Sequence, residues 1–234
     1  MPEVQLDHEH PARLENFQPV MGVVRTAQQE FRKLLLHARD SGGITRERYV
    51  RYMSMQYHLT KEVQRPFMMI AAHPALARRK KLRDFLYNFA LEEEPHFSVA
   101  EDDLDNMGEK PLPMPFDVEL WWAYFNSIVP TRPFVRLGAT CVLENLGPGA
   151  GALGREMLAA TPFLNKLNTR FLEIHFHEAL PHGDQIIQAM TSVPLSEQEI
   201  ADCREGAVKG AIMYLRMAAW VFRDDAMAEA LASA

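Results

Sequence analysis

Hydrophobic residues recur along most of the chain at spacings of three and four, the pattern of helices with one apolar face. The first such segment covers residues 23–39, and the Ser-Gly-Gly run after it suits the end of a helix. Thr45 suits the N-cap of a second helix that extends to residue 72, with a kink at Pro66 because the proline ring clashes with the preceding turn. No run of β-branched residues between turns stands out, so the pattern predicts an all-α fold.

The remaining pattern completes a single helical domain. A third helix is expected after Pro74 towards Glu92, with a continuation beyond Pro95 to Met107, and a proline-rich loop follows at 108–115. Further helices are expected at 117–128, 133–159, 162–190 and 197–223. Residues 1–20 are polar and carry three prolines, so we interpret them as a flexible N-terminal arm. With no repeat and no obvious linker, residues 21–234 are expected to form one domain of about seven helices.

Composition narrows the classes of function. The 234 residues are 47% hydrophobic and 24% charged, as in a soluble globular protein, and the net charge of -6 offers no basic field for nucleic acid. Cys141 and Cys203 are the only cysteines, which predicts no disulfide framework and fits the cytoplasm. The N-terminus lacks the features of a signal peptide, and no apolar stretch approaches the roughly 18 residues of a membrane span. Exposed apolar helix faces would suit a homodimer.

The densest group of metal-ligand residue types lies near residue 180. His175, Glu178 and His182 are spaced by three and four residues, which places them on one face of the predicted helix. A lone histidine is more often a surface or core group, but a histidine–carboxylate–histidine face can direct several lone pairs at one ion. Pro181 adds a distortion that would re-aim these side chains. The pattern therefore favours metal ligands.

Glu144 follows small and apolar residues and precedes a glycine-rich run. Its carboxylate is expected to be buried, which is costly unless it is paired with a cation or binds a metal. The glycines after it permit the close approach of a cofactor or substrate, or equally a tight crossing of two helices.

A second candidate group, Glu92-Glu-Glu-Pro-His96, puts a carboxylate three (Glu93) or four (Glu92) residues before a histidine. Glu-x-x-His is common in the iron sites of helical bundles, although so short a pattern also arises by chance. It lies on a different predicted helix from Glu144 and from the His175 group. Oxygen donors combined with imidazoles, without thiolates, favour non-haem iron or manganese.

With these residues in this order, the chain resembles the haem-oxygenase-like diiron oxidases, a superfamily related in fold to thiaminase II and pyrroloquinoline-quinone synthase. The resemblance covers about residues 20–225 and implies a haem-oxygenase-like helical bundle. It matches the first carboxylate–histidine pair to Glu93 (or Glu92) with His96, the lone carboxylate to Glu144, and the final histidines to His175 and His182.

The final helix departs from the pattern of that superfamily at one position. Where an aspartate ligand is expected, the chain has Ala179. Glu178 stands one residue earlier, about 100° away around an ideal helix, and its longer side chain makes it the preferred substitute. His177 and Asp184 are less well placed. Without a substitute, the site would hold a single metal or none.

The resemblance also implies a reaction class. Such a protein would use two ferrous ions, or alternatively one iron or manganese, to activate dioxygen against a small carboxylate- or amine-bearing metabolite, for example one derived from an amino acid. Desaturation, carbon–carbon cleavage and N-hydroxylation all remain open, and no catalytic residue is expected beyond the metal ligands. Lys61, Arg65 and Arg136 are candidates to bind a substrate carboxylate, although each also suits a surface ion pair.

Other functions remain as alternatives. Ala179 suits a non-catalytic or cofactor-free protein of the same fold with a decayed metal site. A hydrolase similar to thiaminase II would use Cys141 as nucleophile, although a buried structural cysteine is the simpler interpretation. A ferritin-like bundle needs a second Glu-x-x-His, which the chain lacks because Phe176 follows Glu173 at that spacing. A haem ligand is suggested only by His37.

Overall fold

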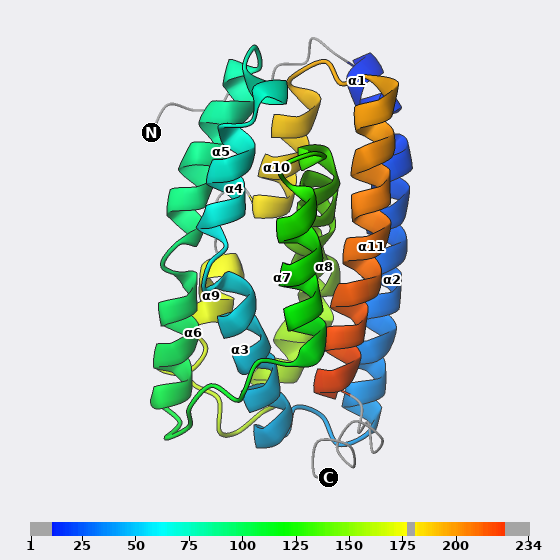
Figure 1. Ribbon diagram of the computed structural model, residues 1–234. Helices are drawn as coiled ribbons and strands as arrows, with labels where there is room; N and C mark the ends of the chain where they lie inside the picture. Colours follow the sequence, from blue (N-terminus) through cyan, green and yellow to red (C-terminus); the bar gives the residue numbers. More distant parts are fainter. Residues whose placement is uncertain (1–10, 177–180, 223–234) are drawn as a thin grey trace.

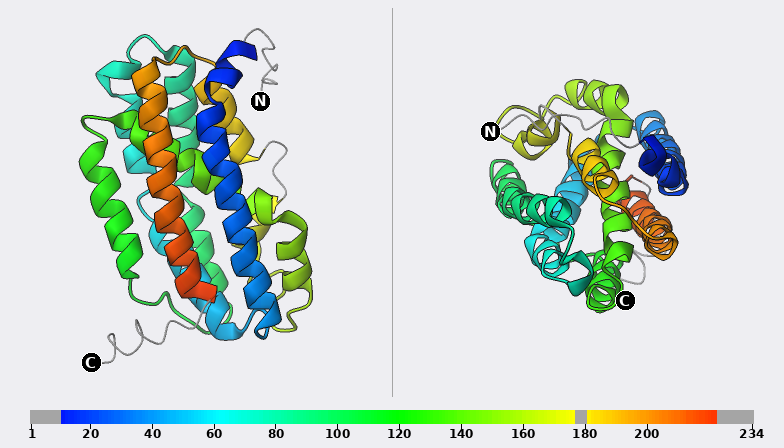
Figure 2. Two further views of the ribbon diagram at one scale, coloured as in Figure 1. Left: turned by 90° about the vertical axis from the view of Figure 1, so that its right-hand side faces the viewer. Right: turned by 90° about the horizontal axis from the view of Figure 1, so that it is seen from above.

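The helices of the computed structural model run mostly up and down around a common axis (Figures 1 and 2). The structure describes residues 11–176 and 181–222, with the side chains of 148 and 149 excepted, and this part of the chain contains no strand. Its elements are α1 (Pro11–Asn16), α2 (Gln18–Asp40), α3 (Arg46–Thr60), α4 (Gln64–Ala71), a 3-10 turn (Pro74–Leu76), α5 (Lys80–Glu93), α6 (His96–Asp105), α7 (Phe116–Ile128), α8 (Pro133–Ala159), α9 (Arg170–Phe176), α10 (His182–Thr191) and α11 (Glu197–Phe222).

Helix α8 occupies the centre of the bundle. It packs against α2, α7, α10 and α11, while α3 packs against α6 and α4 against α5. Figure 1 shows α4 above α3 and α5 above α6, so that each pair forms a broken column on the side of α8 away from α2. Among the described helices, none is long and apolar enough to cross a membrane.

Glycines set the closest crossing, between α8 and α11. A Cβ on Gly138 would lie 1.9 Å from the carbonyl oxygen of Cys203, and one on Gly206 would lie 1.7 Å from that of Val135. Any side chain at these two positions would therefore push the helices apart, because backbone rather than a movable side chain stands in the way. This contact fixes α8, which carries part of the site described below.

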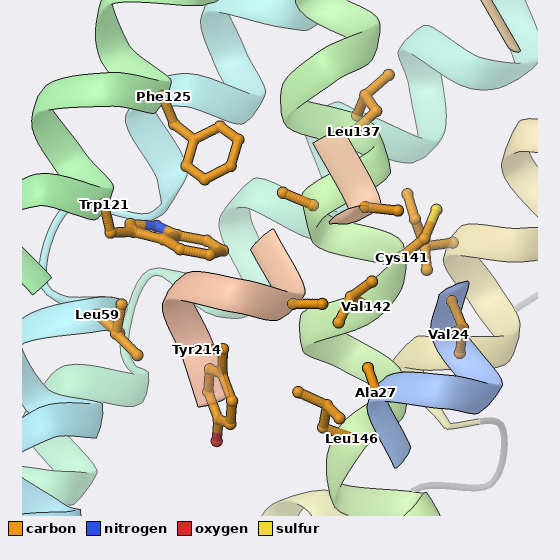
Figure 3. Close-up of a cluster of buried hydrophobic side chains, with 14 of the residues drawn as sticks. Val24, Ala27, Leu59, Trp121, Phe125, Leu137, Cys141, Val142, Leu146 and Tyr214 are labelled. Carbon is orange, nitrogen blue, oxygen red and sulfur yellow. The ribbon is translucent and has the colours of Figure 1, made fainter. Parts of the chain in front are cut away.

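The main core fills the space between α2, α7, α8 and α11 (Figure 3). Leu137 and Val142 of α8, Val24 of α2 and Trp121 of α7 are each at most 2% exposed. Removing the side chain of a residue as buried as Leu137 costs about 2–5 kcal/mol in the free energy of unfolding. The core therefore holds α8 rigidly along its first half.

The predicted helix over 45–72 is two helices. Thr45 caps the first, α3, and its hydroxyl accepts a hydrogen bond from the backbone of Arg48, as expected. Pro66 is the third residue of α4, where the backbone N–H has no partner within the helix, so the proline is tolerated there without a kink. The predicted continuation from Glu92 to Met107 breaks in the same way, because Pro95 becomes the N-cap of α6.

Two further expectations about elements need correction. The part of the predicted N-terminal arm that is described, residues 11–20, is helical, and Phe17 and Val20 are 1% and 0% exposed. The prolines there stand in first turns, where helices accept them. The predicted helix over 162–190 is also wrong: α9 begins at Arg170, and α10 begins after Pro181, whose backbone is extended (φ -55°, ψ 141°). His175 and His182 therefore belong to different helices.

Candidate metal centre

Five of the predicted ligands meet in the interior, each from a different helix. Glu93 is the last residue of α5 and His96 the first of α6, Glu144 lies in α8, His175 is in the last turn of α9, and His182 is the first residue of α10. Glu93, His96 and His182 are 3%, 4% and 3% exposed, respectively. The convergence depends on the helix breaks, since four of the five residues stand at helix ends.

The first pair forms across the break between α5 and α6. His96 Nδ1 donates a hydrogen bond of 2.8 Å to Glu93 Oε2. The other carboxylate oxygen, Glu93 Oε1, is buried and lies 2.6 Å from His182 Nδ1, and among the described residues it meets the criteria for no hydrogen bond. A buried carboxylate oxygen without a hydrogen bond is costly unless a cation is at hand.

Glu144 completes a group of three ligand residues. Its Oε2 lies 3.7 Å from His182 Nδ1. One ligand atom each from Glu93, Glu144 and His182 can be chosen so that all lie within 4.8 Å of one another. The distances from His182 Nδ1 to the two carboxylates, 2.6 Å and 3.7 Å, suit donors around a single ion, because metal–ligand bonds of about 2 Å place donors on opposite sides about 4 Å apart.

His175 adds a third imidazole. Its Nδ1 donates a 2.7 Å hydrogen bond to the carbonyl oxygen of Phe171, which leaves the lone pair on Nε2 for another partner. The three imidazole rings form a triangle, with centroids 5.1 Å apart for His96–His175 and 5.9 Å apart for the two pairs that include His182. Burial lowers the pKa of His175, which favours the neutral imidazole that binds metals.

The carboxyl group of Glu93 is ionised in this group. Burial raises the pKa of Glu93, but the neighbouring imidazoles of His182 and His96 outweigh burial and bring the pKa down to about 2. Glu93 is therefore an anion at neutral pH. Two carboxylates and three imidazoles without a thiolate fit a hard divalent ion such as ferrous iron or manganese.

Glu92, the alternative to Glu93, lies on the outer side of His182. Its side chain is 49% exposed, and its Oε1 is 3.3 Å from His182 Nε2, the ring nitrogen opposite the one that faces Glu93. A carboxylate in this position can orient an imidazole through its second ring nitrogen. The structure thus separates two neighbouring glutamates that the sequence pattern left as alternatives.

The helix α9 is itself held in place from α6. Asp103, 0% exposed, accepts a 2.8 Å hydrogen bond from the backbone N–H of Phe171 at the first turn of α9. It thereby satisfies one of the N–H groups that a helix start leaves without a partner. Because α6 also begins with His96, this contact ties the positions of His96 and His175 together.

Of the residues considered as substitutes for the missing aspartate, only one lies in the described part of the chain. Glu178, with His177 and Ala179, lies outside the described residues, so its role stays a prediction. Asp184 is exposed in the first turn of α10.

Comparison with known proteins defines the fold. No protein-family model matches the chain, and no curated protein matches it in sequence. A solved structure from Shewanella denitrificans OS217, described as a domain of unknown function with a haem oxygenase-like fold, superimposes with a TM-score of 0.69, and the alignment covers 90% of each chain at 20% identity. The chain has a haem-oxygenase-like fold. This confirms the predicted fold class. The function of the chain has to be inferred from the geometry of the site.

In this haem-oxygenase-like bundle, the ligand group stands at a cavity of about 350 Å³. Glu93, Glu144, His175 and His182 all line it, and the other lining residues are mainly apolar side chains of α2, α3, α8, α9 and α11. A volume of this order holds one small organic molecule.

The cationic residues predicted to bind substrate do not line the cavity. Lys61 and Arg65 are exposed. Arg136 is fully buried, donates a 2.6 Å hydrogen bond to Thr140 Oγ1, and has its guanidinium carbon 5.2–5.6 Å from the ring centroids of three aromatic residues, Phe67, Trp121 and Phe125. Burial lowers the pKa of Arg136 to about 10, against the opposing influence of Glu144 and Glu93.

Residues that sequence reasoning missed form much of the cavity wall. Arg155 of α8, Tyr52 and Gln56 of α3 and Tyr214 of α11 all line it. Tyr52 and Gln56 stand four residues apart on one helix face, which is the one local signal that links two of them. Arg155 directly follows the glycine run, and Tyr214 has no distinguishing neighbour.

The alternatives to a non-haem metal site find no support in the geometry. Cys141 is fully buried, does not line the cavity, and has its pKa raised by burial, so it is not placed to supply a thiolate nucleophile. His37 is exposed on α2 and does not line the cavity either.

Proposed function

We propose that the chain is a non-haem iron oxidoreductase that activates dioxygen and oxidises a small organic substrate in the adjacent cavity. Glu93, His96, Glu144, His175 and His182 would hold two ferrous ions, with Glu178 as a further candidate ligand. The observation that carries the proposal is the convergence of two carboxylates and three imidazoles from five helices at one end of an apolar cavity.

The ligand types agree with this chemistry. Bound ferrous iron supplies the electrons with which dioxygen is reduced, a reaction that none of the side chains can perform alone. The residues of the chain do the remaining work: Glu93 and Glu144 balance the charge of a cation, the Phe171 carbonyl fixes the tautomer of His175, and the apolar walls exclude water.

The donors also support a site for two ions. Glu93, Glu144 and His182 suffice for one ion at the spacing that they have. His96 and His175 bring their rings within 5.1–5.9 Å of each other and of His182, so two more imidazole donors stand beside that first group. Glu93 and Glu144 would supply the carboxylates of the set.

Metal analysis tests the proposal directly. Protein purified without oxygen, incubated with ferrous iron and desalted should retain close to two irons per chain, and exposure to oxygen should produce a transient visible absorption with oxygen uptake. His175→Ala and Glu144→Gln should abolish iron loading while the circular dichroism of the helices stays unchanged. His37→Ala, which removes an exposed histidine, is the matched control and should load iron normally.

The contrary results are equally clear. Unaltered iron content in His175→Ala would remove that residue from the ligand set. If the natural chain binds neither iron nor manganese while remaining folded, the proposal fails, and the chain is better described as a non-catalytic protein of the same fold.

A further inference from the structure

Several polar groups of the cavity wall already form hydrogen bonds within the protein. The guanidinium of Arg48 donates to the carbonyl oxygens of Ala38, Ser41 and Gly43 and to the Ser41 hydroxyl. Gln56 Nε2 donates a 3.2 Å hydrogen bond to the Tyr214 hydroxyl. A ligand in the middle of the cavity therefore meets a surface that behaves as apolar.

Three glycines widen the cavity along α8. Gly147, Gly151 and Gly154 all line it, and a Cβ added at any of them would meet nothing within 4 Å. They differ in this respect from Gly138, where a Cβ would strike backbone. The glycine run after Glu144 thus leaves room for a ligand, and the helix-crossing alternative applies to other glycines of the chain.

Arg155 marks a mouth of the cavity, because it lines the cavity and is exposed to solvent. The guanidinium carbon of Arg155 lies 5.7 Å from the ring centroid of Phe176, another lining residue. Within the described part of the chain, no carboxylate forms an ion pair with Arg155.

The two ends of the cavity differ in charge. Glu93 and Glu144 lie near the buried guanidinium of Arg136, which offsets their negative charge, whereas the exposed Arg155 lies eleven residues after Glu144 along α8. An anionic group is therefore attracted to Arg155, while an apolar body gains free energy along the wall between the two ends.

We propose that the cavity binds an organic anion with an apolar body, its anionic head against Arg155 and its apolar end towards the metal centre. This placement deepens the proposed function and depends on it only for the identity of the metal centre at the inner end of the cavity. Oxidation would then occur on the apolar end of the ligand, away from its anionic group. Of the carboxylate- and amine-bearing substrates expected from the sequence, the charges favour the carboxylate.

Two fluorescent probes of similar size and opposite design test this inference on the metal-free protein. Anilinonaphthalene sulfonate has an aromatic body with an anionic head, and phenylnaphthylamine has nearly the same body without a charge. Both should bind the natural chain. Arg155→Met, which keeps an unbranched apolar side chain but removes the charge, should weaken sulfonate binding about tenfold and leave the neutral probe unaffected, whereas Arg155→Lys should restore most of the loss.

A cavity-filling variant shows where the probes bind. Gly154→Leu places a side chain in the free space of the cavity and should weaken both probes at least tenfold. Ala152→Leu adds the same side chain two residues earlier, at an exposed position outside the lining, and should change neither.

Three results would overturn the inference: sulfonate binding that Arg155→Met leaves intact, equal losses of both probes in that variant, or probe binding that Gly154→Leu does not affect. Because the probes are measured without metal, the inference and the proposed function fail separately. Charge-dependent probe binding by a chain that takes up no iron would leave the anion site standing and remove the oxidase.

Discussion

The side-chain amide of Asn145 donates hydrogen bonds to two carbonyl oxygens, that of Cys141 at 2.8 Å within α8 and that of Gly183 at 3.2 Å in α10. A Cβ on Gly183 would lie 2.5 Å from Asn145 Oδ1, so the two residues are in close contact. Each of them directly adjoins a candidate metal ligand, Glu144 and His182. The contact therefore sets the position of one ligand helix against the other.

Asn145→Ala should consequently weaken metal binding without removing a ligand. We expect a loss of about 1–2 kcal/mol in the free energy of unfolding, because the carbonyl of Gly183 loses a buried partner, and about a tenfold weaker binding of ferrous iron. Chemical denaturation and metal competition measure the two effects. Asn106→Ala removes a comparable bond, from an exposed asparagine to Leu167, and should leave iron binding intact. If Asn145→Ala lowered stability alone, the contact would have no influence on the site.

Glu92 is predicted to orient His182 through its second ring nitrogen, 3.3 Å away. Glu92→Ala should weaken ferrous binding about tenfold, and Glu92→Gln, which keeps an acceptor oxygen, should weaken it less. Glu94→Ala removes an exposed carboxylate from the same short segment and serves as the control for charge alone. A complete loss of iron in Glu92→Ala, as severe as in Glu93→Ala, would show that Glu92 is a ligand.

Arg136 is expected to matter most when the metal is absent. Its buried charge lies near Glu93 and Glu144, whose negative charge it offsets, and a bound cation would take over this role. Arg136→Met should therefore lower the free energy of unfolding by about 1–3 kcal/mol in the metal-free protein, and by less in the metal-loaded protein. Calorimetry of both forms measures the loss of stability in each. The contacts of Arg136 with aromatic rings are lost in both forms, so they cancel when the two losses are subtracted. Equal destabilisation of the two forms would reduce Arg136 to a packing residue.

Asp103 provides a test through pH. Burial raises the pKa of this carboxyl group in the folded protein, against the hydrogen bonds from the backbone at the start of α9. Because the pKa of Asp103 is higher in the folded protein than in the unfolded chain, the free energy of unfolding falls as the pH rises from the pKa of the unfolded chain to that of the folded protein.

Asp103→Asn should remove this loss, since an amide does not titrate and its oxygen still accepts the N–H of Phe171. Stability measured across mildly acidic to neutral pH should then fall less in the variant than in the natural chain. Asp103→Ala, without an acceptor, should be less stable at every pH by about 1–2 kcal/mol. A variant Asp103→Asn with an unchanged pH profile would contradict the assignment of the titration to this residue.

The sequence allowed the fold class and most of the candidate ligands to be predicted because both depend on local patterns. Glu93 and His96 are three residues apart, and the apolar spacing that indicates helices is equally local. The prediction placed His175 and His182 on one helix, whereas Pro181 separates two helices whose packing brings the rings together. No short-range pattern could reveal that.

The residues of the cavity wall could not be predicted from the sequence for the same reason. Arg155 and Tyr214 become neighbours of the site only through the packing of α8 and α11 against α3. Arg136 illustrates the opposite error: a cation near Glu144 in sequence suggested a substrate ligand, and the fold encloses it among aromatic rings instead.

The origin of the ligands in five helices has a consequence for how the protein matures. The Glu93–His96 pair can form early, from one short stretch of chain, but the contact between Glu92 and His182 closes a loop of 90 residues. An ion that needs all five side chains can bind only after α8, α9 and α10 have docked, and it then protects that state by mass action. Iron supply would thus govern how long newly made molecules survive proteases, and cells short of iron should contain less of this protein even at constant synthesis.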